Sequence, residues 1–176
     1  MTIIAAILTV LLVLIFVVPL FIKKDYHISQ FVSVRKPKTE VFAYVKELGN
    51  QVYYNKWVMA DPNVKRVTSG TDGTVGFRNA WDSEVKSVGK GEQEITKVVP
   101  GERVDSTVRF EKPFKNVAQI EMTTETESSG VTRLGWSMHG RNKYPMNIMN
   151  LFIPGMLSRD MAESLGNLKA IIENRD

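Results

Sequence analysis

The chain has 176 residues, enough for one well-buried domain and too few for two of ordinary size. It contains no cysteine and only two histidines, which excludes disulfides, thiolate metal sites and cysteine nucleophiles and disfavours histidine-rich metal sites. Its net charge of +4 comes from 23 basic residues scattered among 19 acidic ones, which is typical of a solvated surface, with a weak attraction to anionic lipid as the alternative interpretation.

The amino-terminal stretch is apolar enough to predict a membrane-spanning helix. Ile3–Ile22 is twenty residues without a charge, and a helix of that length, at about 1.5 Å per residue, matches a bilayer core of roughly 30 Å. A cleaved signal peptide is the alternative, but no basic region precedes the stretch and no small-x-small site precedes Lys23. Lys23 and Lys24 come directly after it, so the positive-inside rule predicts a cytoplasmic location for the rest of the chain. We therefore expect a single-pass anchor over residues 1–24 and one domain over residues 25–176.

The next segment predicts one strand and two short helices. Tyr26–Val34 alternates apolar and polar residues, as a half-buried strand does, and Pro37 ends it. Thr39 is a candidate cap for a short helix that reaches Leu48. A second short helix, about Gln51–Val58, is rich in aromatic residues.

Six further alternating segments, separated by Gly-, Pro- and Ser-containing turns, predict strands. They are Val64–Ser69, Val75–Trp81, Gly89–Val99, Val104–Phe110, Asn116–Thr126 and Val131–Gly140. With the first strand they make about seven, and clean alternation predicts an antiparallel sheet with one face in water.

The carboxyl-terminal part predicts a long amphipathic helix. Asn147–Ile153 is a short apolar segment and a candidate lid, and Pro154-Gly155 after it is expected to break the chain and to act as a hinge. Ser158–Asn174 then carries an apolar stripe with helical spacing, and Ser158 is its candidate cap. This helix is the only element long enough to cover the apolar face of the sheet, so an α+β fold is expected.

The order of elements and several local strings resemble the START-like superfamily, also called SRPBCC, including its bacterial polyketide cyclase/dehydrase-type members. The strings are Val34–Phe42, Val88–Thr96, Pro100–Val104, Thr132–Met138 and Ser164–Lys169. The resemblance covers about residues 26–174 and implies a helix-grip fold, in which a curved antiparallel sheet wraps around the terminal helix. It also implies an apolar cavity between them for a lipid, polyketide, steroid or similar ligand. Such a fold does not by itself specify a reaction.

The alternation assigns a set of mostly apolar side chains to the concave face, and this set forms the candidate ligand site. An ordinary filled core is the alternative interpretation for each of them. The candidates, with flanking residues from the two carboxyl-terminal segments, are Phe77, Asn79, Trp81, Gln93, Ile95, Val108, Phe110, Ile120, Met122, Trp136, Met138, Met149, Phe152, Met161 and Leu165.

No catalytic residue is predicted. The register places His27 and His139 on the wet face of the sheet, together with the carboxylates of Glu92 and Glu94. Gly89-Lys90-Gly91 lacks the other residues of a phosphate-binding loop and predicts a turn.

Two basic residues of the sheet, Arg78 and Arg109, also point outward by register, although an anionic head group is the alternative partner for them. The aromatic residues do not alternate with basic ones, so nucleic-acid binding is not expected. No metal or cofactor is predicted.

The sequence thus predicts a membrane-anchored protein that binds a small hydrophobic ligand, and binding is favoured over enzymatic activity. The alternatives are a cyclase or dehydratase acting on a polyketide-like substrate, which Asn79 or Gln93 would orient, and a protein-interaction module at the membrane.

Overall fold

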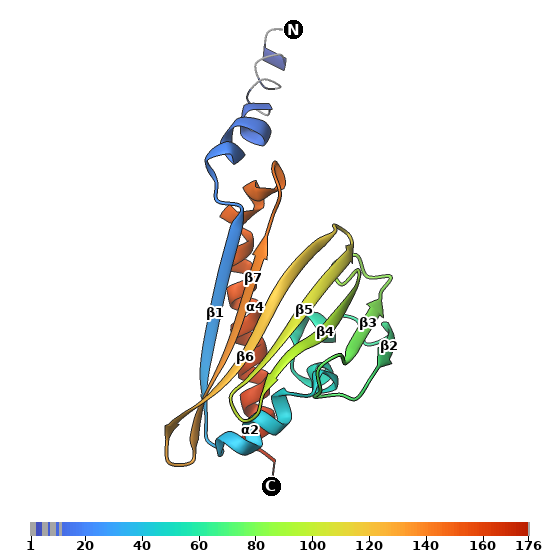
Figure 1. Ribbon diagram of the computed structural model, residues 1–176. Coiled ribbons are helices and arrows are strands. Elements are labelled where there is room, and N and C mark those ends of the chain that lie inside the picture. The colour runs from blue at the N-terminus through green and yellow to red at the C-terminus, as the bar shows by residue number, and fades with distance from the viewer. Residues whose placement is uncertain (1–2, 5–6, 8–9, 11, 176) are drawn as a thin grey trace.

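The computed structural model describes residues 3–4, 7, 10 and 12–175, and its main feature is a curved antiparallel sheet that wraps around one long helix (Figure 1). The strands are β1 (Asp25–Val34), β2 (Lys65–Ser69), β3 (Arg78–Asp82), β4 (Lys90–Val99), β5 (Arg103–Lys112), β6 (Asn116–Ser128) and β7 (Val131–Arg141). The α-helices are α2 (Lys38–Val45), α3 (Lys56–Met59) and α4 (Ile153–Glu173). Shorter helical segments are η1 (Val13–Val17), η2 (Val18–Phe21), η3 (Leu48–Tyr53) and η4 (Met146–Leu151).

The seven strands pair in the order β1-β7-β6-β5-β4-β3-β2, and every pairing is antiparallel. The predicted alternation sets the register, because a slip of one residue would move each apolar side chain to the wet face. The expected α+β helix-grip architecture is therefore present, with β1 lying beside β7 at one edge of the sheet (Figure 1).

The long helix α4 buries one stripe against the concave face of the sheet. Met161, Leu165, Leu168 and Ile172 of this stripe are buried in the main core, as their spacing predicts. The expected start at Ser158 was wrong, because the helix begins at Ile153.

The Pro154-Gly155 pair does not form a hinge between segments. Both residues lie inside the first turn of α4, where proline is tolerated because its missing N–H would have no intrahelical partner there. The hydroxyl of Ser158 does not cap the helix and instead accepts a hydrogen bond of 2.7 Å from Nε2 of Gln30 on β1.

Three other predicted boundaries were also wrong. The first short helix follows Pro37 directly, and Thr39 makes no capping hydrogen bond. The second is split into η3 and α3, because the side chain of Asn55 caps α3 by accepting a hydrogen bond from the Trp57 amide. The strand β3 begins at Arg78, so Val75 lies in the preceding loop and is exposed.

The two ends of the sheet carry different sets of loops. One end, which we call the pocket end, carries the segment before β1 and the loops 60–64, 83–89, 113–115 and 142–152. The other, which we call the far end, carries the loops 35–37, 70–77, 100–102 and 129–130. The helix α4 starts at the pocket end, where the amino-terminal segment also lies, and finishes at the far end (Figure 1).

The predicted anchor, residues 1–24, lies partly outside the described residues. Within residues 3–4, 7, 10 and 12–175, no helix has both the length and the apolar character that a membrane crossing needs. The described part includes η1 and η2, in which the side chains of residues 13–17, Leu20 and Phe21 are exposed, Val18 is half-buried and Pro19 is buried. The membrane anchor stays a prediction.

Candidate functional site

A cavity of about 320 Å³ opens between the concave face of the sheet, the short helix α3 and the start of α4. Its walls are mainly aliphatic and aromatic, with a few amide groups and one guanidinium. The lining residues are Tyr26, Gln51, Asn55, Trp57, Val58, Val64, Arg66, Asn79, Trp81, Ser87, Val88, Gln93, Val108, Phe110, Ile120, Trp136, Met138, Met156 and Leu157. Its volume falls within the range of small-molecule sites, which begins at about 300 Å³.

Small residues in the sheet, beneath the residues that line the cavity, make room for the aromatic walls. Tyr26, Gly140, Ala118 and Val108 form one cross-strand row of the sheet. A Cβ atom at Gly140 would clash with the hydroxyl oxygen of Tyr26, so this ring covers the glycine at a distance that no larger residue permits. The ring can lie close to the sheet here because the residues beneath it have little or no side chain.

A second glycine has the same role under the opposite wall. A Cβ atom at Gly91 would lie 2.6 Å from the indole of Trp81, and this indole packs edge to face against Phe110 with ring centroids 6.1 Å apart. Nε1 of Trp81 donates a hydrogen bond of 3.2 Å to the carbonyl of Val88. The loop 83–89 therefore fixes the orientation of this aromatic wall.

Two buried polar atoms of the lining residues have no hydrogen-bond partner among the described residues. They are Oδ1 of Asn79 on β3 and Nε1 of Trp136 on β7. The neighbouring amide of Gln93 is in part satisfied, since its Nε2 donates to Oγ of Ser106 at 2.9 Å. An unpaired buried polar atom costs about 1–3 kcal/mol, so the cavity wall carries one unsatisfied acceptor and one unsatisfied donor, both enclosed by protein atoms in this conformation.

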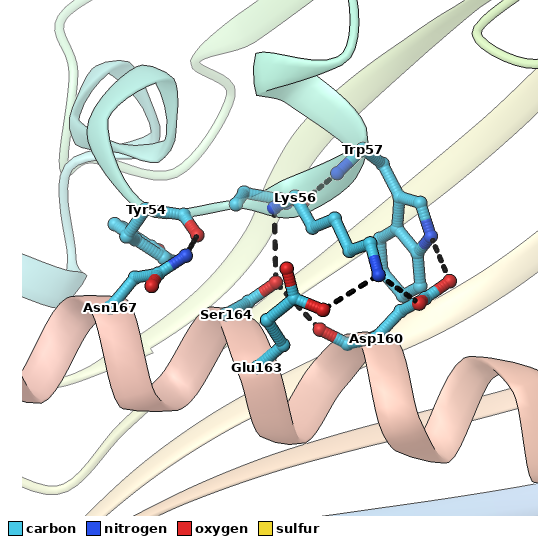
Figure 2. A network of polar contacts seen from close by, with 8 residues as sticks. Tyr54, Lys56, Trp57, Asp160, Glu163, Ser164 and Asn167 are labelled. Atoms are coloured by element: carbon cyan, nitrogen blue, oxygen red, sulfur yellow. Dashed lines mark hydrogen bonds and ion pairs between the residues drawn. The ribbon is translucent and has the colours of Figure 1, made fainter.

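The aromatic wall on the helix side is held by a polar network between α3 and α4 (Figure 2). Nε1 of Trp57 donates to Oδ2 of Asp160 at 3.1 Å, and Nζ of Lys56 lies 2.9 Å from Oδ1 of the same carboxylate. The Trp57 ring packs edge to face on Trp136, with centroids 5.7 Å apart. Asp160 therefore positions the indole of Trp57, which in turn positions the indole of Trp136, whose N–H is unpaired.

Further contacts of this network hold the backbone of α3 on the long helix. Oγ of Ser164 accepts from the amide of Lys56 at 3.0 Å and donates to the carbonyl of Asp160 at 2.8 Å (Figure 2). Nδ2 of Asn167 donates to the carbonyl of Tyr54 at 3.3 Å. The hydrogen bond from Lys56 to Glu163 raises the pKa of this lysine, so it stays charged in the network.

The cavity contains little that titrates near neutral pH. Among its lining residues, all of which are described, Tyr26 and Arg66 are the only titratable ones. Burial raises the pKa of the Tyr26 hydroxyl, which therefore stays protonated. Burial also lowers the pKa of Arg66, while the nearby Asp61 raises it, and the guanidinium is held by a hydrogen bond of 3.2 Å to the carbonyl of Val58.

The structure distributes the predicted site residues over three environments. Eight of them line the cavity: Asn79, Trp81, Gln93, Val108, Phe110, Ile120, Trp136 and Met138. Five are packed in the core: Met122, Met161 and Leu165 in the main cluster, and Phe77 and Ile95 in a second cluster with Phe42, Leu48 and Val104. Met149 and Phe152 are exposed at the pocket end. Seven of the fifteen positions thus lie outside the cavity wall.

The lining residues that the sequence did not indicate come mostly from short helices and loops. Alternation identifies a strand face, but it carries no signal for η3, α3 or the loop 83–89. The exceptions are Tyr26, at the start of β1, Arg66, on β2, and the pair Met156 and Leu157, near the start of α4. The small residue Gly140 paired with an aromatic across the sheet is the one local signal that points to Tyr26.

The residues predicted to face water do so. His27 and His139 are exposed and pair across β1 and β7, with rings edge to face at 6.2 Å. On the outer face Glu94 makes ion pairs with Arg109 at 2.8 Å and with Arg78 at 3.2 Å. The hydrogen bond from Arg109 lowers the pKa of Glu94, so these groups neutralise one another rather than facing a ligand.

The Gly89-Lys90-Gly91 string is not itself a turn, because Lys90 and Gly91 are the first residues of β4 and only Gly89 lies in the connection before the strand. Gly89 has φ of +63°, and a Cβ atom there would meet the carbonyl of Lys112. Among the described residues no group of three or more histidine, aspartate and glutamate side chains is arranged to hold a metal ion.

Comparison with known proteins places these features in a family. The family model described as polyketide cyclase / dehydrase and lipid transport matches residues 26–173. No curated protein matches the sequence significantly.

Several solved structures share the fold at low sequence identity. Truncated norcoclaurine synthase from Thalictrum flavum superposes with a TM-score of 0.67 at 9% identity, covering 88% of this chain and 98% of that one. A structural-genomics protein from Chromobacterium violaceum gives 0.61 at 17% identity, covering 85% and 98%. The Aha1 dimer protein from Colwellia psychrerythraea gives 0.58 at 14% identity, covering 85% and 97%. At these identities the likeness concerns the fold alone.

Proposed function

Because the chain belongs to the polyketide cyclase / dehydrase and lipid transport family, we propose that it binds a small hydrophobic ligand in the cavity between the sheet and α4. The observation that carries this proposal is the pairing of a mainly apolar cavity with two unpaired polar atoms in its walls, Oδ1 of Asn79 and Nε1 of Trp136. A filled core would leave no volume there, and a core without a ligand would gain stability from apolar residues at both positions.

We propose that the ligand reaches both atoms after small movements of the two side chains, and the atoms then indicate which polar groups it carries. The indole N–H of Trp136 requires an acceptor, and the amide oxygen of Asn79 requires a donor. Four strand-to-strand steps separate β7 from β3 in the sheet, so the two groups approach the ligand from opposite walls. A mainly apolar molecule with a hydroxyl at one end and a carbonyl, ester or second hydroxyl oxygen at the other satisfies both.

The described lining residues offer few side chains that can act as a general acid or base, which favours binding over catalysis. General acid–base chemistry needs a side chain whose pKa lies near the working pH. Of the described lining residues only Tyr26 and Arg66 titrate, and burial raises the pKa of the first away from neutrality. A cyclase or dehydratase that orients its substrate through Asn79 and Gln93 is the second candidate, since the family description includes such enzymes.

The membrane anchor and the cytoplasmic orientation are the finer part of the proposal. They rest on the twenty uncharged residues Ile3–Ile22, on Lys23 and Lys24 after them, and on the exposure of the large apolar side chains described in this stretch. We propose that residues 1–24 tether the domain, residues 25–176, on the cytoplasmic side of a membrane. A carboxyl-terminal reporter that is active only in the periplasm would contradict this orientation.

The test of ligand binding is to purify the full chain in mild detergent from a lipid-containing host and to identify what it retains by native mass spectrometry. Two matched substitutions are compared with the wild type. Val108→Phe fills the cavity, and Val67→Phe, on the exposed face of β2, is its control. We expect a retained small molecule in the wild type and in Val67→Phe, and its loss in Val108→Phe. An empty wild type overturns the proposal, and a retained molecule that is chemically converted supports the enzyme instead.

A further inference from the structure

Exposed apolar side chains gather at the pocket end of the molecule. Six large ones on the loop 113–115, on η4 and at the start of α4 form what we call the apolar rim: Phe114, Met146, Met149, Leu151, Phe152 and Met156. The far-end loops, which are all described, expose a single large apolar side chain, that of Val75. An exposed cluster on one end of a domain indicates an interaction surface, whereas single exposed apolar residues do not.

The apolar rim is continuous with the mouth of the cavity. Met156 is 49% exposed and also lines the cavity, and the next residue, Leu157, lines it as well. The side chain of Phe152, 69% exposed, precedes them by one turn of α4. A partner that covers the apolar rim therefore also covers the mouth of the cavity.

The charges around the apolar rim identify the partner's chemistry. The segments at the pocket end carry Lys23, Lys24, Lys86, Lys115 and Lys143, and none of these has a carboxylate within ion-pair distance among the described residues. The acidic residues of the same segments are Glu84 and the buried Asp61. Apolar side chains at the same end of the domain as unpaired lysines fit a surface with an apolar interior and anionic head groups, which is an anionic phospholipid bilayer.

The amino-terminal segment leaves the domain beside this surface. Nδ2 of Asn147 donates to the carbonyls of Pro19 and Ile22 at 2.7 and 2.8 Å. Nδ2 of Asn150 donates to the carbonyls of Lys23 and Lys24 at 2.9 and 3.0 Å. These contacts hold the chain before β1 against η4, and the amino-terminal segment leaves the domain beside the start of α4 (Figure 1). A bilayer that receives the apolar amino-terminal residues therefore also meets the rim.

We propose that the apolar rim lies in the head-group region of an anionic phospholipid bilayer, with the mouth of the cavity open toward the lipid. Ligand then moves between bilayer and cavity without crossing water, past Met156 and Leu157. The docking itself does not require that the cavity hold a ligand, but it rests in part on the proposed tether of residues 1–24.

The absence of cysteine makes a site-specific test direct. Full-length Phe152→Cys and Phe114→Cys, and the control Val75→Cys at the far end, each receive a polarity-sensitive fluorophore and are reconstituted into vesicles of phosphatidylcholine and phosphatidylglycerol. Quenching by a spin-labelled lipid and by aqueous iodide is compared. We expect the labels at 152 and 114 to be quenched by lipid and shielded from iodide, with the opposite result at 75.

Two results overturn the proposal. In the first, iodide and not the spin-labelled lipid quenches the label at 152 or at 114, which places that part of the rim in water. In the second, neither agent reaches the labels, which indicates that a second copy of the chain covers the rim. Because the measurement follows lipid contact and not the contents of the cavity, an empty protein in the ligand experiment leaves its outcome unaffected.

Discussion

The concave face of the sheet is packed at the far end and hollow at the pocket end. At the far end, Leu168 and Ile172 of α4 share one buried cluster with Val34 and Leu134 of the sheet, and all four are almost fully enclosed. At the pocket end the same helix contributes Met156, which lies half exposed beside the cavity. One helix on one sheet thus provides both a core and a site.

The difference lies in the size of the side chains and not in their pattern. Apolar residues alternate along the strands at both ends, so both ends face the helix. At the pocket end, however, Ala118 and Gly140 lie in the sheet beneath the lining residues, and rings stand at the walls instead of filling the centre. Close packing at one end gives the rigidity that lets the other end stay open.

The largest expected effect separates the two ends of α4. Leu168→Ala should lower the free energy of unfolding by about 2–5 kcal/mol, because it opens a cavity in the packed core. The matched change Met156→Ala, at the mouth of the cavity, should cost less than about 1 kcal/mol since this side chain is half exposed. Urea unfolding followed by tryptophan fluorescence measures the free energy of unfolding of both variants. Equal losses of stability would contradict the division into a packed end and a hollow end.

The next effect concerns the glycine under Tyr26. Gly140→Ala should cost about 1–3 kcal/mol, because the new Cβ forces the ring away from its position. We also expect it to reduce ligand retention, since the space open to the displaced ring is the cavity itself. Gly166→Ala on α4, where a Cβ meets nothing within 4 Å, is the control and should stabilise the protein by about 0.5–1 kcal/mol. The same unfolding assay, with retention by native mass spectrometry, reports both.

The contrast between the two ends also explains what the sequence could predict. Period-2 alternation identified the seven strands and their buried face, and the stripe of α4 identified its contacts, because both follow from backbone geometry. Alternation cannot distinguish a core residue such as Ile95 from a cavity residue such as Gln93, which share one face of β4. That distinction depends on which residues stand across the sheet and how far they reach.

The helix ends were predicted less well for a different reason. Pro154 can stop a helix or begin one, and only the preceding chain decides. Here η4 is held by the hydrogen bonds of Asn147 and Asn150 to the segment before β1, so α4 can start directly after it. These contacts join residues more than a hundred positions apart, and no local pattern encodes them.

Replacing the unpaired acceptor should separate stability from binding. Asn79→Leu removes a buried oxygen with no partner, so the free energy of unfolding of the empty protein should stay equal or rise by up to about 1 kcal/mol. Ligand affinity should fall by about fivefold to tenfold, as expected for the loss of one hydrogen bond. Denaturation and a ligand-retention titration measure the two quantities. Loss of stability together with unchanged affinity would show that Asn79 serves the fold and not the ligand.

The smallest effect tests the packed end through its pH dependence. The amide of Arg35 donates to Oε1 of Glu173 at 2.7 Å, and this hydrogen bond, with help from the guanidinium of Arg35, holds the pKa of the carboxyl below its ordinary value of 4.5. A carboxyl with a lowered pKa in the folded state stabilises the fold fully above the unfolded pKa and loses that effect as the pH falls through the folded pKa. Glu173→Gln should therefore be less stable than the wild type at neutral pH, by under about 1 kcal/mol because the pair is close to solvent.

The difference in stability between Glu173→Gln and the wild type should vanish when unfolding is measured on the acid side of the folded pKa, because protonated Glu173 no longer offers its charge to Arg35. Ligand retention should not change in Glu173→Gln, since Glu173 lies at the far end of α4. A loss of retention together with stability in this variant would show that the two ends are coupled.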